Sequence, residues 1–420
     1  MSALLRLRNG WRWLHDPFAV LRAGLARHGP TFELELPVHG RCLVTGDPQL
    51  LRALVSSPDL DAGRGITALR KVLGHGSLIM LDGPSHHARR RLVAPAFRAD
   101  VAARYDALTV DTAREATRAL RVDRATRMYD VLLSISRTAI VRALFAPESN
   151  GRTLALEHAV DAFLRAATNP VVLFARPLQV DLGGFSGWGR LLRARAALSE
   201  LVRAEIVRAR CSPTRGALIE PLTPGLDDEA LVEEVLALLV FGHDTGAAAM
   251  SWALAHLVEH PEALRRAADD PAPGGYLEAC IDESMRLCPV VCHLTRVAAR
   301  PTRLGAHSLE VGQRVLPATW IAHHDPASWT EPEAFRPERF LAPAQPDDPR
   351  ETSYLPFGLA PRTCVGRPFV LRQMRLVLHT LITTVRLSPR PGWHPRPVRQ
   401  NVLIVPEGGT PMVVLGPSRP

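Results

Sequence analysis

The segment from Phe357 to Gly366 reads FGLAPRTCVG and carries one cysteine, Cys364, in a loop punctuated by glycine and proline. Apolar residues recur at helical spacing directly downstream, which predicts a helix over Arg367 to Val385. Loop amide groups and a helix N-terminus near a sulfur both favour the thiolate over the thiol. The segment therefore predicts a cysteine with thiolate character at the start of a helix.

Three roles are open for Cys364: a nucleophile, a metal ligand, or an inert buried cysteine in a turn. Nucleophilic catalysis needs a nearby base and an orienting group, and nothing in the loop supplies them. Ligation of a haem iron fits better, because Arg362 lies two residues earlier and offers a guanidinium for a haem propionate. The other five cysteines are scattered without a CxxC pair and are typical of small buried hydrophobes.

The best helical pattern upstream starts at the aspartates 227 and 228 and runs to about His260, before Pro261. Acidic residues suit a helix N-terminus, and proline commonly follows a helix end. The chain is apolar on most sides from Leu236 to Phe241. This pattern predicts a helix through the middle of the protein.

Polar residues interrupt that helix at Gly242-His243-Asp244-Thr245. An acid beside a hydroxyl residue is costly in apolar surroundings unless it is satisfied, and threonine can bend a helix by bonding an upstream carbonyl. The group therefore marks either a tolerated kink or a functional site.

Two further pairs have helical spacing. Glu283 and Arg286, at i and i+3, share one helix face. His86 and Arg90, at i and i+4, also share one face, so both side chains can reach the same anion. Taken alone, the first pair is typical of a surface ion pair and the second of solvated charge.

The remaining chain predicts a mainly helical protein with a minor β part. A helix is expected over Asp16 to His28, and helices dominate from Asp100 to Leu287. Prolines become dense from Pro289 onward, where short β-type runs alternate with turns. The expected strands are Thr31 to Leu36, Arg41 to Thr45, Leu309 to Leu316, Val402 to Val405 and Pro411 to Leu415.

The 420 residues include 51 Lys and Arg against 42 Asp and Glu, a net charge of +9 that is compatible with a polyanion partner. The arginines are dispersed and no nucleic-acid motif accompanies them, which is more typical of solvated faces. No run of 18 apolar residues is long enough to span a bilayer, and arginines break the N-terminus, which lacks a signal-peptide core. We expect no nucleic acid, no membrane span and a cytoplasmic location.

These motifs, taken in order, resemble those of the cytochrome P450 superfamily. The cysteine loop is similar to the haem signature FxxGxRxCxG, with Ala360 in the place of the usual glycine. The helical group resembles [AG]Gx[DE]T, with Phe241 in the first position and Gly246 where a second hydroxyl residue is frequent. The charged pairs resemble ExxR and HxxxR, and residues 335–340, FRPERF, resemble the PERF segment.

The resemblance implies a cytochrome P450 fold in one domain over residues 1–420, with haem between the long central helix and the cysteine loop with its helix. The small β-rich part would occupy about 30–60 and 295–320, and the helical part about 80–290 and 366–386. It also implies roles: Cys364 ligates the iron of haem b; His86, Arg90, Arg296 and Arg362 bind its propionates; Glu283, Arg286 and Arg339 form a charge network under the loop; Asp244 and Thr245 hold water and relay protons.

The implied function is that of a soluble bacterial-type haem-thiolate monooxygenase. It would use O2 and two electrons from a separate ferredoxin or flavodoxin with its reductase to hydroxylate or otherwise oxidise a lipophilic small molecule, in secondary metabolism. Arginines near the loop would form a basic docking face for an acidic partner: Arg89, Arg91, Arg362, Arg367, Arg372 and Arg375. A peroxide-driven peroxygenase and a non-catalytic haem sensor or carrier remain alternatives.

By the same likeness, mostly apolar residues line a substrate pocket: Ala237, Phe241, Val290, Val291, His293, Leu294 and Leu403, with the region from Phe163 to Trp188 beside them. His293 is a candidate polar anchor. The Phe241 ring would reduce the room for substrate beside the haem.

Overall fold

A computed structural model describes residues 10–36, 39–146, 150–167, 179–182, 185–211, 217–341, 348 and 350–418. The α-helices are α2 (Pro17–His28), α3 (Pro48–Ser56), α4 (Arg70–Leu73), α5 (Gly83–Val93), α6 (Ala99–Ala102), α7 (Asp106–Arg118), α8 (Met128–Phe145), α9 (Asn150–Ala167), α11 (Gly187–Cys211), α12 (Asp228–Glu259), α13 (Pro261–Asp269), α14 (Tyr276–Leu287), α15 (Thr319–His324), α16 (Arg350–Ser353) and α17 (Arg367–Thr384). Short 3-10 helices are η1 (Gly63–Leu69), η2 (Ala94–Phe97), η3 (Ala103–Tyr105), η5 (Glu220–Leu222), η6 (Pro337–Phe340) and η7 (Glu407–Gly409).

The strands are short and lie mainly at the two ends of the chain. They are β1 (Thr31–Leu36), β2 (Gly40–Thr45), β3 (Leu60–Asp61), β4 (Ala125–Arg127), β5 (Arg296–Ala298), β6 (Thr302–Leu304), β7 (His307–Leu309), β8 (Arg314–Pro317), β9 (Val385–Pro389), β10 (Pro397–Gln400), β11 (Leu403–Pro406) and β12 (Pro411–Pro417). The mainly helical class with a minor β part is thus confirmed.

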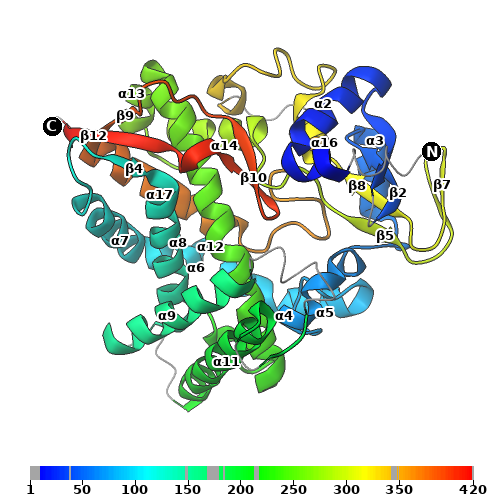
Figure 1. Ribbon diagram of the computed structural model, residues 1–420, viewed down its shortest axis with the longest axis horizontal. Coiled ribbons are helices and arrows are strands. Elements are labelled where there is room, and N and C mark those ends of the chain that lie inside the picture. Colours follow the sequence, from blue (N-terminus) through cyan, green and yellow to red (C-terminus); the bar gives the residue numbers. More distant parts are fainter. Residues whose placement is uncertain are drawn as a thin grey trace.

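Helix α12 runs through the middle of the molecule (Figure 1). The Asp227 side chain caps its start by accepting a hydrogen bond from the backbone N–H of Ala230 at 2.8 Å, and Pro261 follows its end. It is the one helix in the described part of the chain that is long and apolar enough to cross a membrane, and most of that apolar stretch is buried inside the protein. Burial on several sides explains why its sequence lacks a polar face.

The largest sheet joins two distant parts of the sequence. Its five strands follow the order β1-β2-β8-β5-β3, so strands from residues 31–61 pair with strands from residues 296–317. β1 and β2 are antiparallel with Thr31 opposite Thr45, whereas β2 and β8 run parallel. The blue and yellow ribbons meet there in Figure 1, and this pairing brings Arg296 on β5 toward the N-terminal third.

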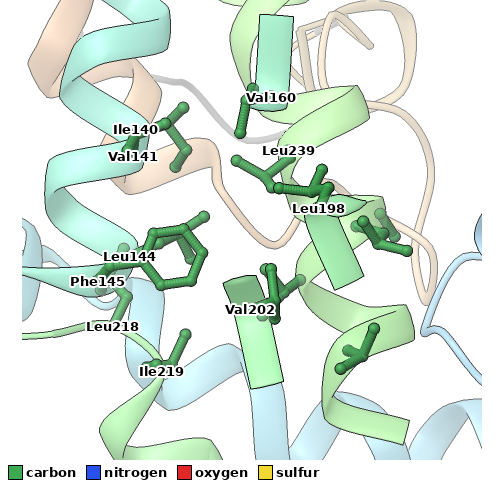
Figure 2. Close-up of a cluster of buried hydrophobic side chains, with 14 of the residues drawn as sticks. Ile140, Val141, Leu144, Phe145, Val160, Leu198, Val202, Leu218, Ile219 and Leu239 are labelled. Atoms are coloured by element: carbon green, nitrogen blue, oxygen red, sulfur yellow. The ribbon is translucent and has the colours of Figure 1, made fainter. Parts of the chain in front are cut away.

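The main core lies between α8, α9, α11 and α12. Figure 2 shows Ile140, Leu144 and Phe145 of α8 on one side of the cluster, facing Leu239 of α12 and Val202 of α11 on the other. Burying a side chain of this size contributes about 1.5–3 kcal/mol, so this cluster fixes α12 against its neighbours. A second cluster packs the other half of α12 against α14 and α17.

Helices α12 and α17 approach each other closely at Gly246. A Cβ atom at this position would lie 3.1 Å from Cγ2 of Val370 on α17. The Val370 side chain would therefore have to shift by a few tenths of an ångström to admit a side chain at position 246, and glycine avoids this contact.

Candidate functional site

The cysteine loop is a folded hairpin-like turn that ends at α17. The backbone N–H of Cys364 donates to the carbonyl of Phe357 at 2.8 Å, and the N–H of Arg362 donates to the carbonyl of Leu359 at 2.8 Å. Gly366 is the N-cap of α17, so the thiol lies just before the helix N-terminus. These bonds hold Cys364 in one place without using its side chain.

The Cys364 side chain is exposed, yet the atoms around its thiol partly desolvate it, and this desolvation raises its pKa. The backbone N–H groups of Gly366 and Arg367 and the charge of Arg90 lower the pKa but do not outweigh burial. An uncharged thiol is a poor nucleophile, and the loop suits a cysteine that ionises when it binds a cation.

Ala360 fits the loop where the family pattern has glycine. Its side chain is exposed and its backbone does not adopt the left-handed conformation. Gly358 in the same loop does, with φ of 83°, and there a side chain would be strained. The departure at position 360 therefore leaves the loop geometry intact.

Basic side chains predicted to bind propionates gather beside the loop. Arg90 of α5 donates to the carbonyl of Thr363 at 2.7 Å, and Arg362 donates to the carboxylate of Asp82. Arg296 of β5 donates only to the carbonyl of Thr295, at 3.0 Å, among its described contacts. Burial, and then the charges of Arg362 and Arg90, lower the pKa of the neighbouring His86 to about 4.

This cluster fits a group with two carboxylates. Burial, and then repulsion from Arg362, lower the pKa of Arg296 to about 10. Asp82 is the carboxylate that pairs with Arg362, and it also accepts from the backbone N–H groups of Ala62 and Gly63 at 2.9 Å. Positive charge is thus in excess, and two added carboxylates would relieve it. A haem, with one ligand site at Cys364 and two propionates at these cations, matches this donor set.

Asp82 is a functional candidate that the sequence motifs missed. It lies 280 positions from Arg362 in the chain, and no local pattern links the two residues. The only local signal is its place before Gly83 and Pro84 at the start of α5, where it occupies the N-cap without a side-chain capping bond. The carboxylate is engaged by Arg362 and the η1 backbone instead.

Asp244 and Thr245 lie next to each other on α12 but have different partners. The hydroxyl of Thr245 donates to the carbonyl of Phe241 at 2.8 Å, one turn upstream. The carboxylate of Asp244 is 9% exposed and accepts a hydrogen bond from the phenol of Tyr129 on α8. Tyr129 is a second residue that sequence patterns missed, because it lies 115 positions away.

Glu283 and Arg286 form a buried ion pair on α14. Both side chains are 0% exposed, with Nε to Oε2 at 2.7 Å and Nη2 to Oε1 at 2.9 Å. Arg339 also donates to Glu283, at 3.2 Å. Arg286 further donates to the carbonyls of His323 and Pro332. The structure thus brings these three charged residues together under the segment that leads into the cysteine loop.

His323 connects this network to the cysteine loop. Its Nδ1 lies 3.0 Å from the carbonyl of Arg286, and its Nε2 accepts from the backbone N–H of Leu355 at 2.7 Å. Nε2 must be unprotonated to accept, so the ring is neutral with its proton on Nδ1. Burial lowers the pKa of His323 well below 6.5.

His324 provides a test of acid sensitivity. Burial lowers the pKa of His324 to about 3. Below pH 6.5 this histidine is therefore protonated in the unfolded chain while it stays neutral in the folded protein. Its contribution to stability is complete above pH 6.5 and is lost as the pH falls toward 3. Between pH 6.5 and about 5 this loss is about 2 kcal/mol.

We therefore expect that, between pH 6.5 and about 5, the unfolding free energy of His324→Gln falls by about 2 kcal/mol less than that of wild type. Denaturant titrations across this pH range measure the difference. His28→Gln changes an exposed histidine and serves as the control. Parallel slopes for wild type and His324→Gln would contradict the assignment of a buried neutral ring.

The predicted pocket residues fall in several packed clusters. Ala237 and Phe241 belong to the main core, while Val290, Val291 and Leu403 belong to the second cluster. The N–H of Ile404 donates to the carbonyl of Val290 at 2.8 Å, so the β10–β11 hairpin lies against the segment after α14.

Two predicted pocket residues have contacts that sequence alone did not indicate. The His293 ring centroid lies 4.8 Å from that of Trp13, and its Nδ1 is 3.3 Å from Sγ of Cys292. Leu294 packs with Leu355 and Leu359, next to the cysteine loop. Residues 168–178 and 183–184 of the expected Phe163 to Trp188 pocket region lie outside the described residues.

Comparisons with known proteins agree along nearly the whole chain. The family model "Cytochrome P450" matches residues 12–271 and 273–412. "Putative cytochrome P450 135B1" of Mycobacterium bovis is 29% identical, over 97% of this chain and 88% of that protein. "Putative cytochrome P450 137" of Mycobacterium tuberculosis is 26% identical, over 92% and 83%. The crystal structure of CYP175A1 from Thermus thermophilus superposes with a TM-score of 0.76 at 28% identity, covering 96% of this chain and 95% of that one.

Proposed function

Because the chain belongs to the cytochrome P450 family, whose members are haem-thiolate monooxygenases, we propose that it binds haem b at Cys364 and oxidises a lipophilic small molecule with O2. The observation that carries this proposal is the convergence at the cysteine loop of an exposed thiol before a helix N-terminus and an excess of cations that are buried or partly buried. No other ligand class matches both features as well, since the thiol suits a soft metal and the cations suit carboxylates.

Different residues of this chain would ligate the iron, bind the propionates and border the substrate space. Cys364 would ligate the iron, and Arg90, Arg296 and Arg362 with His86 would hold the propionates. Bound haem supplies the oxygen chemistry. Phe241 and Ala237 on α12 would limit the space for substrate on the other side.

Asp244 and Thr245 would deliver protons to the haem site. The Thr245 hydroxyl, which donates to Phe241, has lone pairs that can accept from water. The buried Asp244 carboxylate would exchange protons with such water. This acid and alcohol pair favours O2 and external electrons over a peroxide-driven peroxygenase. It also favours catalysis over a haem sensor or carrier, since a protein that never cleaves oxygen needs no proton relay.

Electrons would come from a separate ferredoxin or flavodoxin with its reductase. Three of the six arginines that sequence placed on a docking face have internal carboxylate partners: Arg89 pairs with Glu234, Arg362 with Asp82 and Arg372 with Asp106. Arg375 donates to the carbonyl of Pro271. Arg91 and Arg367 are exposed and have no ion pair with any described residue, so the proposed docking face rests on these two.

Arg367→Glu should therefore slow reduction by an acidic partner by about tenfold at low salt, because it reverses a charge beside the cysteine loop. Stopped-flow reduction across an ionic-strength series measures this, and the difference from wild type should fade as salt screens the charge. Arg27→Glu, the same change at an exposed site on α2, is the control. A salt-independent rate in wild type would remove the electrostatic docking model.

The proposal includes a lipophilic substrate, a role in secondary metabolism and a cytoplasmic location. The predicted pocket residues are mainly apolar, which favours a lipophilic molecule. The curated relatives are mycobacterial and carry no substrate in their names.

The visible spectrum of the dithionite-reduced protein with carbon monoxide tests the proposal first. Thiolate-ligated haem should give a strongly red-shifted Soret band. Absence of bound haem, or a band typical of histidine ligation, would return Cys364 to the alternatives of nucleophile or inert cysteine. Product formation per O2 consumed, with a surrogate ferredoxin system, then separates an oxygenase from a sensor.

A further inference from the structure

Tyr129 contacts the acid of the predicted relay directly. It is the second residue of α8, is 2% exposed, and donates its phenol hydrogen to Oδ1 of Asp244 on α12. Helices α8 and α12 lie side by side in Figure 1, and Tyr129 belongs to the second cluster, which also contains residues of α12 just after Asp244. No sequence motif includes Tyr129.

A third side chain fixes the direction of this hydrogen bond. The Nε2 amide of Gln400, the last residue of β10, donates to the phenol oxygen of Tyr129 at 3.4 Å. The phenol oxygen thus accepts from Gln400, and its hydrogen is free to be given to Asp244. Burial and the charge of Asp244 raise the pKa of Tyr129 far above its usual value, so the phenol stays protonated.

Among the titratable and charged groups described around this pair, only the Tyr129 phenol donates a hydrogen bond to the Asp244 carboxylate. On α12 the neighbouring His243 has its pKa lowered by burial, and its Nδ1 lies 2.8 Å from the carbonyl of Leu239. From the α8 side, the charge of Asp130 raises the pKa of Tyr129 and that of Arg127 lowers it. The charge of Arg137 lowers the pKa of His243. None of these groups has a hydrogen bond to the Asp244 carboxylate among the described contacts.

We propose that Tyr129 is a positioning residue for the proton relay, which holds the Asp244 carboxylate in one orientation by donating a hydrogen bond to it. The proposal rests on the proposed function, since it assigns a purpose to the relay acid. Tyr129 acts through Asp244 and does not touch the reacting atoms. Gln400 ties this arrangement to the β10–β11 hairpin, whose Leu403 is a predicted pocket residue.

Tyr129→Phe removes one hydrogen-bond donor and keeps the buried ring. Loss of a donor to a carboxylate favours the protonated acid, so the band of the protonated Asp244 carboxyl should persist to higher pH in the variant than in wild type. Infrared difference spectra of the haem-loaded protein across pH measure this directly, with Asp244→Asn to assign the band. The matched control is Tyr276→Phe, which removes a phenol that donates to Glu338 at 3.0 Å, a carboxylate outside the relay.

A turnover measurement tests the consequence for the relay. Tyr129→Phe should lower product formed per O2 consumed, and the loss should depend on pH as the carboxyl titrates. The double variant Tyr129→Phe/Asp244→Asn should lose no more coupling than Asp244→Asn alone, because both act through one carboxylate. Equal titration of Asp244 in Tyr129→Phe and wild type, or additive losses in the double variant, would overturn the proposal.

The measurements distinguish failure of the proton relay from failure of the role of Tyr129. If Asp244→Asn leaves coupling intact, the relay in the proposed function fails, while the infrared titration still decides whether Tyr129 controls Asp244. If Tyr129→Phe does not fold, a ring-fluorinated tyrosine at position 129 replaces it. The more acidic phenol is a stronger donor, so it should move the Asp244 titration to lower pH. No shift in that protein would equally overturn the proposal.

Discussion

Cys364→His should lose the red-shifted Soret band of the reduced carbon monoxide complex completely, together with all product formation. The reason is local. The backbone N–H of Cys364 is bonded to Phe357, and its thiol accepts only from the backbone N–H groups of Gly366 and Arg367 among the described contacts, so the hydrogen bond that closes the turn does not use the substituted side chain. Imidazole donates less electron density to iron than thiolate does, and the thiolate is what favours oxygen cleavage in this family.

The control for this result is Cys211→Ser, which changes the other exposed cysteine, at the end of α11. It should keep the spectrum and the activity of wild type. The haem content of Cys364→His, measured by the pyridine haemochrome, separates loss of ligation from loss of binding. A red-shifted band that survives in Cys364→His would assign the iron ligand to another residue.

Local patterns predicted the elements of this fold well because they depend on neighbours in sequence. α12, expected from about Asp227 to His260, spans Asp228–Glu259, because a capping aspartate and a proline mark its ends. α17 ends one residue before the expected Val385. The expected strand from Leu309 to Leu316 is instead the end of β7 and most of β8, with Gly312 in a left-handed turn between them. Glycine at that position allows the turn that divides the strand.

Local patterns could not predict contacts between residues that lie far apart in the sequence. The glutamate–arginine spacing at Glu283 and Arg286 is the same as that at Glu262 and Arg265, yet the first pair is 0% exposed and the second about 70%. Burial depends on what packs above the helix, which spacing does not reveal. Arg372 of the predicted docking face likewise meets an aspartate from a distant helix, a partner that spacing does not reveal.

Because the Glu283–Arg286 pair is buried, we expect Arg286→Ala to destabilise the protein strongly. Arg286→Ala would leave the Glu283 carboxylate buried with only Arg339 and the backbone N–H of Arg336 as described donors. It would also remove the donors to the carbonyls of His323 and Pro332. Breaking a buried ion pair by removing one partner costs about 3–5 kcal/mol. We expect that loss in unfolding free energy, with a matching loss of bound haem, because the pair supports the segment that enters the cysteine loop.

Arg265→Ala breaks the exposed pair at the same spacing and should cost less than about 1 kcal/mol. Denaturant unfolding and haem content of both variants, measured together, separate burial from charge pairing as the cause. A loss for Arg286→Ala no larger than that for Arg265→Ala would mean that the loop holds its shape without the network. A large loss of haem with unchanged protein stability would instead place the role of Arg286 at the cysteine loop itself, since His323 carries the contact from Arg286 to Leu355.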